Sequence, residues 1–454
     1  MGGSAFSYLE NPPFTPRMSP VIYKQVKTAC HAALGELFVY VATPIEGPAK
    51  LDHGDIDIFV SQEKRLYFPK TKVDIIPKSH NDLLNEVKLL LNAEFCKIVG
   101  QSANLTIKWP SSTEVPKNEK GQEASIQVDV RICRDIDQLC WSLFKHAHGD
   151  IWNILGSTIR PFGLTVDEES LWLRIPEIEN HDRPRSKIKL TSDPVEILHF
   201  FGMKVEGYWS QPFASVQDLF EYATTCRFFW VRPEPAPKLE NYDDQAGVIG
   251  GEQGKKKLKA NDRKRMAYRA VYRRWIEEYI PQLRAENKFS TPPANFSSGN
   301  NDTKQFRAIV RDEAFQTFLF VEKEYNDRLK EWRYQKDAEK IKRLIKEVIH
   351  ATVPVPDEKT TEMTQQSRQT LIHKRSCLVS GMKKIILREK EDADAGFKAV
   401  FRPEFSDKDG GFDIEVVRAF LLNNQKQVGE IAWGLEVARY EQFKERKQLK
   451  RKAE

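Results

Sequence analysis

In the first half of the chain, short runs of alternating apolar and polar residues lie between stretches with helical periodicity. Tyr23 to Leu37 has apolar residues at helical spacing, and residues 38–42 and 51–60 read as strands. Apolar positions i, i+3 and i+4 predict a helix, whereas period-two alternation predicts a strand. The same rules predict a helix at 81–93, strands at 95–100, 103–109 and 124–133, and a helix-rich segment at 137–160. This mixture predicts an α/β fold.

After Trp230 the pattern changes. Residues 231–257 are rich in Pro, Gly and charged residues, which is typical of a linker or an exposed loop. The remainder is strongly charged and has helical periodicity. We therefore expect an N-terminal extension (1–20), an α/β domain (21–150), a small α+β part (151–232), a linker (233–262) and a mostly α-helical C-terminal domain (263–454).

Composition narrows the class of protein only slightly. The 454 residues are 40% hydrophobic and 30% charged, and the net charge of +6 permits an acidic partner such as nucleic acid without requiring one. The six cysteines show neither C-x-x-C nor zinc-finger spacing, so free thiols in a reducing compartment are expected. No apolar run reaches transmembrane length, and the N-terminus lacks the layout of a signal peptide. These features predict a soluble nuclear or cytoplasmic protein with no membrane partner, and they leave the oligomeric state open.

Two aspartates interrupt the apolar run LDHGDIDIFV at residues 51–60. Asp55 and Asp57 are two apart, so in a strand their side chains point to the same face. A third acid, Asp129, occupies an alternate position in the run IQVDVRI. If the two strands are neighbours, three carboxylates converge, and such oxygen ligands suit two Mg²⁺ ions shared with substrate phosphates. A solvated face of the sheet would also carry such acids, because short motifs of this kind are weak on their own.

These segments resemble the palm of the nucleotidyltransferase superfamily, and most closely that of family X, the DNA polymerase beta-like enzymes. HGDIDIF and IQVDVRI resemble the two catalytic strands of that palm, with a helix and a polar hairpin between them. Residues 138–174 and 193–212 resemble the family's thumb, so the resemblance covers roughly residues 23–230. It implies an α/β nucleotidyltransferase palm with a mixed β-sheet and a small thumb-like α+β part. It also implies three catalytic ligands for two Mg²⁺ ions, with Mn²⁺ as a substitute: Asp55, Asp57 and Asp129.

The family holds the triphosphate with a Gly-Ser pair in the turn before the first catalytic strand, and this chain departs from that pattern. The corresponding stretch is VATPIEGPAK, in which Thr43 would supply a hydroxyl and Gly47 a tight turn. Its two prolines have no amide proton to donate. Asn153 falls where the family's asparagine touches the base edge, although a capping or turn residue is an equally good interpretation. The nucleotide-binding residues implied by the resemblance are Thr43, Gly47, Gly54 and Asn153.

Residues 254–284 are the most basic region of the chain. No helix-hairpin-helix segments, with which the family grips primer and template, precede the expected palm, so we expect another element to hold nucleic acid. Cations beside aromatic residues can contact phosphates while bases stack. The expected contacts are Arg263, Lys264, Arg265, Arg269, Arg273 and Arg274, interleaved with Tyr268, Tyr272 and Trp275. An amphipathic helix that buries Trp275 and leaves its cations in solvent explains the same pattern.

The leading prediction is a Mg²⁺-dependent nucleotidyltransferase, similar to a DNA polymerase or a terminal transferase. It would transfer a nucleotide from an NTP or dNTP to a 3′-hydroxyl of DNA or RNA and release pyrophosphate. The acceptor, the need for a template and the sugar preference stay open. Two alternatives also stay open: a palm-fold protein that has lost catalysis and binds nucleic acid, and nucleotidyl transfer to an acceptor that is not a nucleic acid.

Overall fold

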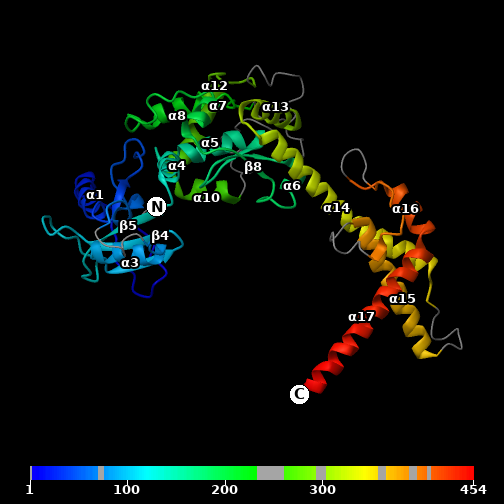
Figure 1. Cartoon of the computed structure of the whole chain (residues 1–454). Coiled ribbons are helices and arrows are strands. Elements are labelled where there is room, and N and C mark those ends of the chain that lie inside the picture. Colours follow the sequence, from blue (N-terminus) through cyan, green and yellow to red (C-terminus); the bar gives the residue numbers. More distant parts are fainter. Residues whose placement is uncertain are drawn as a thin grey trace. The chain divides into compact units, whose positions relative to one another are not determined.

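The computed structural model describes residues 3–69, 76–232, 260–292, 303–355, 364–387, 396–405 and 411–453. The chain divides into two compact units, Met1–Val321 and Glu322–Glu454 (Figure 1). The described strands form a five-stranded and a three-stranded sheet, both in the first unit, whereas the second unit is helical. This confirms a mixed sheet with helices in the N-terminal part and a mostly helical C-terminal region. Within the described residues, we find no helix with the length and apolar character needed to cross a bilayer.

The five-stranded sheet contains the strands predicted between residues 38 and 133. Its order is β1-β2-β5-β4-β3, in which β2 and β5 are parallel and the other neighbours are antiparallel. The strands are β1 Phe38–Ala42, β2 Asp55–Glu63, β3 Phe95–Val99, β4 Ser102–Lys108 and β5 Ser125–Cys133. The helices of this part are α1 Pro20–Leu34, α2 Lys64–Tyr67, α3 His80–Leu90 and α4 Ile136–His146. The predicted start of β2 at Leu51 is wrong, because His53 instead pairs through its backbone with Met18 in an isolated bridge.

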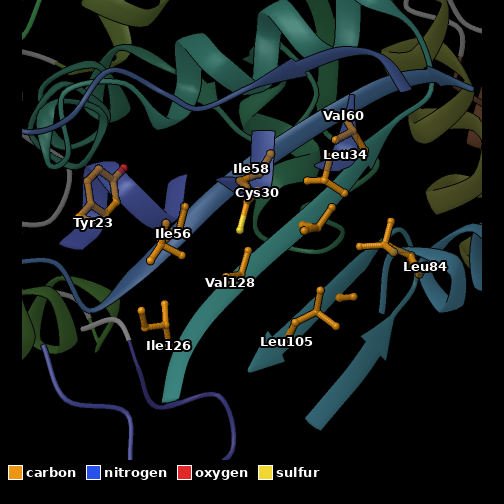
Figure 2. Packing of buried hydrophobic residues seen from close by; sticks show 14 of the residues in the cluster. Tyr23, Cys30, Leu34, Ile56, Ile58, Val60, Leu84, Leu105, Ile126 and Val128 are labelled. Carbon is orange, nitrogen blue, oxygen red and sulfur yellow. The ribbon is translucent and has the colours of Figure 1, made fainter. Parts of the chain in front are cut away.

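One face of this sheet is apolar. Ile56, Ile58 and Val60 of β2 point to it and are fully or almost fully buried. Helices α1 and α3 contribute to the same core, and Figure 2 shows Tyr23 and Leu34 of α1 in the cluster with these residues. Because strand side chains alternate, the intervening residues of β2 belong to the opposite face.

On the opposite face, α4 covers the part of β2 and β5 beyond the aspartates, and Phe6 packs on Phe95 of β3. Leu139 of α4 packs on Phe59 of β2 and Cys133 of β5. Asp57, one alternation before Phe59, is exposed. Along β2, the acid Asp57 is therefore followed on this face by the aromatic Phe59 at the place where α4 begins to cover the sheet.

The smaller sheet and its helices form a small α+β part at the position expected for one. Its antiparallel strands have the order β6-β7-β8, and they are β6 Leu164–Val166, β7 Leu171–Arg174 and β8 Lys187–Thr191. The helices are α5 Ile151–Ile159, the 3-10 turn η2 Arg160–Phe162, α6 Pro176–Glu179, α7 Pro194–Phe200 and α8 Val216–Thr224. Aromatic rings fill its core: Phe228 lies 4.9 Å from Phe162 and 5.8 Å from Phe201, measured between centroids.

The helices from residue 260 to residue 317 belong to the first unit. They are α10 Ala260–Tyr268, α11 Ala270–Arg274, the π-helical turn η4 Trp275–Tyr279, α12 Ile280–Ala285 and α13 Thr303–Thr317. Trp275 is fully buried, with its ring 5.2 Å from Phe220 and 5.4 Å from Phe229. Phe306 of α13 lies 5.9 Å from Phe162. The helical region expected from residue 263 is therefore divided, because its first helices pack on the aromatic core of the smaller sheet.

The expected linker, residues 233–262, also ends earlier than the composition indicates. Residues 233–259 of this segment lie outside the described residues, whereas 260–262 are already helical. Asp262 is buried and forms ion pairs with Arg160 at 2.9 Å and with Arg265 at 2.6 Å. These pairs give the first turn of α10 a defined place in the unit.

The second unit contains four long helices among its described residues, α14 Val321–Thr352, α15 Gln365–Leu387, α16 Ile414–Asn423 and α17 Gln425–Ala453. Its core includes Ile341, Met382, Leu421 and Val428. α15 and α17 approach closely at Gly381, where an added Cβ would lie 3.0 Å from Val428 Cγ1. A glycine at this position therefore permits the helix contact.

Replacing Trp275 with alanine is expected to lower the free energy of unfolding by roughly 3–5 kcal/mol, because a large buried ring is lost and a cavity remains. Tyr268→Ala is the matched control, since Tyr268 is 56% exposed on the preceding helix. We expect the control to change stability by less than about 0.5 kcal/mol. Urea unfolding followed by circular dichroism measures both variants, and equal stabilities would contradict the core position of Trp275.

Candidate functional site

Three aspartates lie on the partly covered face of the five-stranded sheet. The parallel register of β2 and β5 places Asp57 opposite Asp129, and Asp55 opposite Gln127. Strand alternation puts all three aspartates on one face. The prediction that these two strands are neighbours is therefore confirmed.

The pKa of Asp57 shows how closely these charges interact. Burial, followed by repulsion from Asp55 and Asp129, raises it from 3.8 to about 7, while His146 and Lys50 oppose the rise. Asp57 nevertheless retains solvent exposure, so its charge is partly screened. Burial in the surrounding protein and two nearby like charges both disfavour the carboxylate form, so both raise the pKa of Asp57.

The other two aspartates are also harder to ionise than usual. Burial raises the pKa of Asp129 to about 6, and Asp55 adds to the rise, whereas hydrogen bonds from Asn104 and Gln127 oppose it. Gln127 Nε2 donates to both carboxylate oxygens of Asp129, at 2.9 and 3.0 Å. Burial likewise raises the pKa of Asp55, while Lys50 and Arg17 oppose this rise.

The donor chemistry of this cluster suits a magnesium ion, although the side chains are not gathered around one point. Within the described part of the chain, no three His, Cys, Asp or Glu side chains stand together as a ligand set. The aspartates supply the hard oxygen ligands that Mg²⁺ prefers, and a divalent cation would relieve the repulsion that raises their pKa values. Asp55, Asp57 and Asp129 are therefore the residues that would hold it.

The loop between β1 and β2 lies where the resemblance implies triphosphate binding. The Thr43 hydroxyl is already hydrogen-bonded to His31 Nε2, at 2.7 Å. The turn expected at Gly47 lies at Pro48 and Ala49, directly after it, and the left-handed φ of 52° belongs to Ala49. An added Cβ at Gly47 would lie 3.6 Å from the Cα of Gly149, which is an ordinary van der Waals contact. Gly54 is buried directly before Asp55.

The same loop contains a polar network that was not predicted from the sequence. The Glu46 carboxylate accepts hydrogen bonds from the Tyr23 hydroxyl and from Lys50 Nζ. The ring of His53 stacks on Tyr23. Although burial opposes it, the bonds from Lys50 and Tyr23 lower the pKa of Glu46. The only sequence signal was the spacing of Glu46 and Lys50, which in a loop predicts no contact.

Asn153 lies in the first turn of α5 and bonds to the N-cap residue Asp150, so it is not itself the cap that the sequence left open as an alternative. Its Nδ2 donates to Asp150 Oδ1 at 3.1 Å, and its backbone N–H donates to the carbonyl of Asp150 at 2.9 Å. Asp150 Oδ1 also accepts from Arg269 Nη1 at 2.6 Å. In this arrangement Asn153 helps to orient the start of α5.

Several of the cations expected to contact nucleic acid bond within the protein. Arg265 pairs with Asp262, Arg269 with Asp150, and Arg274 with Glu278. Arg273 donates to the carbonyls of Met266 and Ala267. Tyr272 and Trp275 are buried, which excludes them as stacking surfaces, whereas Tyr268 is exposed. Arg263 and Lys264 are also exposed.

Glu168 contacts three basic side chains that lie far from it in the sequence. It lies 3.2 Å from Arg131 Nη1, 3.6 Å from Lys145 Nζ and 3.3 Å from His146 Nε2. The hydrogen bond with His146 is the largest of the effects that lower the pKa of Glu168 to about 2. Arg131 is two residues after Asp129 on β5, so this cluster links the loop between β6 and β7 to the carboxylate face.

A scan against protein-family models finds no match for this chain, and a search of curated proteins finds no similar one. The resemblance to family X enzymes therefore depends on the motifs of the chain itself.

Asp57→Asn is expected to stabilise the metal-free protein at pH 8 by about 1 kcal/mol, because it removes a charge that two neighbours repel and that solvent only partly screens. The pKa of Asp57 rises to about 7 on folding. Wild-type stability should therefore fall as the pH rises from about 4 to 7, and this fall should be smaller in the variant. Thermal unfolding in EDTA measures the stability of both proteins at each pH. Asp327→Asn, at an exposed position of α14, is the control. Equal changes of stability in both variants would contradict the repulsion between Asp57 and its neighbouring carboxylates.

Glu168→Gln is expected to destabilise the protein by about 0.5–1 kcal/mol at low salt, since the ion pairs are partly exposed and screened. The pKa of Glu168 is lowered to about 2. Its contribution should therefore be complete above about pH 4.5 and disappear as the pH falls through 2. Urea unfolding at low and high salt tests this. Glu169→Gln, at the exposed neighbouring position, should have no comparable effect.

Proposed function

We propose that the first unit is a nucleotidyltransferase similar to the DNA polymerase beta-like enzymes. The observation that carries this proposal is the parallel register that sets Asp57 opposite Asp129, with Asp55 on the same face. Carboxylates placed this way on rigid strands are what transfer of a nucleotide from a triphosphate requires. In this reading the five-stranded sheet is the palm, and the smaller sheet with its helices is the thumb.

The aspartates share one task in this proposal, and Asp129 has a second. All three would hold Mg²⁺, which when bound would neutralise charge on the triphosphate and lower the pKa of an attacking hydroxyl. Asp129, whose pKa is raised to about 6, is suited to accept the proton of that hydroxyl at neutral pH. The 3′-oxygen then forms a bond to the α-phosphorus, and the bond between that phosphorus and the pyrophosphate oxygen breaks.

A nucleic-acid acceptor is supported by the cations on α10 that remain exposed. Arg263 and Lys264 are exposed on this helix, which the Arg160–Asp262 pair holds on the part that contains the smaller sheet. Exposed cations on an anchored helix suit phosphate contact without base specificity. The acceptor is accordingly DNA or RNA in this proposal.

One observation favours a second candidate, a palm-fold protein that binds nucleic acid without catalysis. The β1–β2 loop has two buried prolines in place of a Gly-Ser pair, and the Thr43 hydroxyl is engaged by His31. Such a loop offers few donors for a triphosphate. This candidate predicts nucleic-acid binding that does not depend on nucleotides.

The test is incubation with labelled dNTPs and NTPs, Mg²⁺ or Mn²⁺, and single-stranded, primed or gapped acceptors. Wild-type protein is expected to extend at least one acceptor. Asp57→Asn and Asp129→Asn should reduce incorporation by at least roughly 10²–10³-fold, the order of loss when one electrostatic stabiliser is removed. Asp327→Asn should retain full activity.

Circular dichroism of each variant shows whether the fold is kept. If wild-type protein extends no acceptor but still binds nucleic acid, the second candidate is correct. If the aspartate variants extend as fast as wild type, the assignment of the site is wrong.

A further inference from the structure

The polar network before β2 has a rigid base. His53 is 6% exposed, its ring centroid lies 3.7 Å from that of Tyr23, and the planes are inclined by only 11°. The backbone of His53 exchanges two hydrogen bonds with Met18, at 2.7 and 2.9 Å. Tyr23, buried on α1, donates to Glu46. Glu46 is thus held from one side by side chains that cannot easily move.

Lys50 is the exposed end of the same network. Its side chain is 45% exposed, and its Nζ donates to Glu46 Oε2 at 2.6 Å. Ala49 precedes it with a φ of 52°, a conformation that non-glycine residues seldom adopt. A long cationic side chain therefore leaves the loop five residues before Asp55, and its ammonium group donates to Glu46.

We propose that Lys50 binds the triphosphate of the nucleotide, and that Glu46 holds its ammonium group while the nucleotide is absent. The inference rests on the proposed nucleotidyl transfer, and it assigns to this chain's own residues the contacts that a Gly-Ser pair would otherwise make. A lysine ammonium is a compact cation that binds phosphate oxygens without demanding a fixed geometry. The β1–β2 loop can therefore hold a triphosphate although it has few amide donors.

The position of Lys50 relative to the aspartates supports this role. Its charge opposes the rise in the pKa of both Asp55 and Asp57, so the ammonium lies within electrostatic reach of the two carboxylates. A phosphate group shared with cations on those carboxylates would lie in the same region.

The exchange of partners is energetically easy. An exposed ion pair such as Lys50–Glu46 contributes only about 0–1 kcal/mol, whereas a charge-assisted bond to phosphate contributes about 1.5–3 kcal/mol. Glu46 keeps the hydrogen bond from Tyr23 when Lys50 leaves, so its carboxylate is not left without a donor. Glu46 thus competes with the substrate for Lys50 and weakens binding slightly.

The experiment measures binding of inorganic tripolyphosphate with Mg²⁺ to the full-length protein, together with nucleotide kinetics on the best acceptor. Lys50→Ala should weaken tripolyphosphate binding and raise KM for the nucleotide by about 10-fold or more, with kcat nearly unchanged. Lys50→Arg should restore most of the affinity. Glu46→Gln should bind a few-fold more tightly, because a competing carboxylate is removed.

Lys120→Ala is the matched control, since Lys120 is exposed in the loop between β4 and β5. If Lys50→Ala and Lys120→Ala bind tripolyphosphate equally well, the inference is wrong while the proposed function stands. A lower kcat with unchanged tripolyphosphate affinity also refutes it. A wild-type protein that neither binds tripolyphosphate nor extends any acceptor refutes the inference and the proposed function together.

Discussion

The parallel pairing of β2 with β5 is the constraint on which the candidate site depends. Because both strands run in the same direction, one register sets Asp57 opposite Asp129 and carries Asp55 on the same face. A shift of one residue in either strand would send its acid to the apolar core. The buried set Ile56, Ile58 and Val60 opposes such a shift, since exposing it would lose the packing against α1. The hydrophobic face of the sheet therefore positions the charged one.

Gathering like charges costs free energy, and the surrounding residues offset part of that cost. Lys50 and His146 oppose the rise in the pKa of Asp57, and Gln127 binds both oxygens of Asp129. The chain nevertheless leaves all three carboxylates harder to ionise than usual. A site that is unfavourable without a cation binds one more strongly, because the cation relieves the repulsion.

Basic residues serve two different purposes in the first unit. Arg269 bonds to Asp150, Arg160 to Asp262 and Arg307 to Glu179, so these ion pairs fasten the helices after residue 260 to the part that contains the smaller sheet. Lys50, in contrast, bonds to Glu46 within its own loop, and Lys264 is exposed on α10; in the proposal both contact phosphate. The net charge of the chain does not distinguish these two groups, because a paired arginine and an exposed lysine count equally.

The sequence by itself determined the local features. Period-two alternation put Asp55 and Asp57 on the face opposite Ile56 and Ile58, and helical spacing correctly made Trp275 a candidate for the core. Both signals operate over a few residues, so they need no knowledge of the rest of the chain. The prediction that β5 lies beside β2 came from the resemblance, since alternation alone does not specify which strands pair.

Only the tertiary structure decided the long-range partners. Asp150 and Arg269 are 119 residues apart, and Glu168 meets Arg131 across 37 residues, so no spacing rule connects them. The proximity of Gly47 to Gly149, about a hundred residues further along the chain, likewise follows from no pattern in the sequence. The sequence records each charge and each glycine, but packing chooses the partner, because the free energy of a contact depends on distance in space and not on distance along the chain.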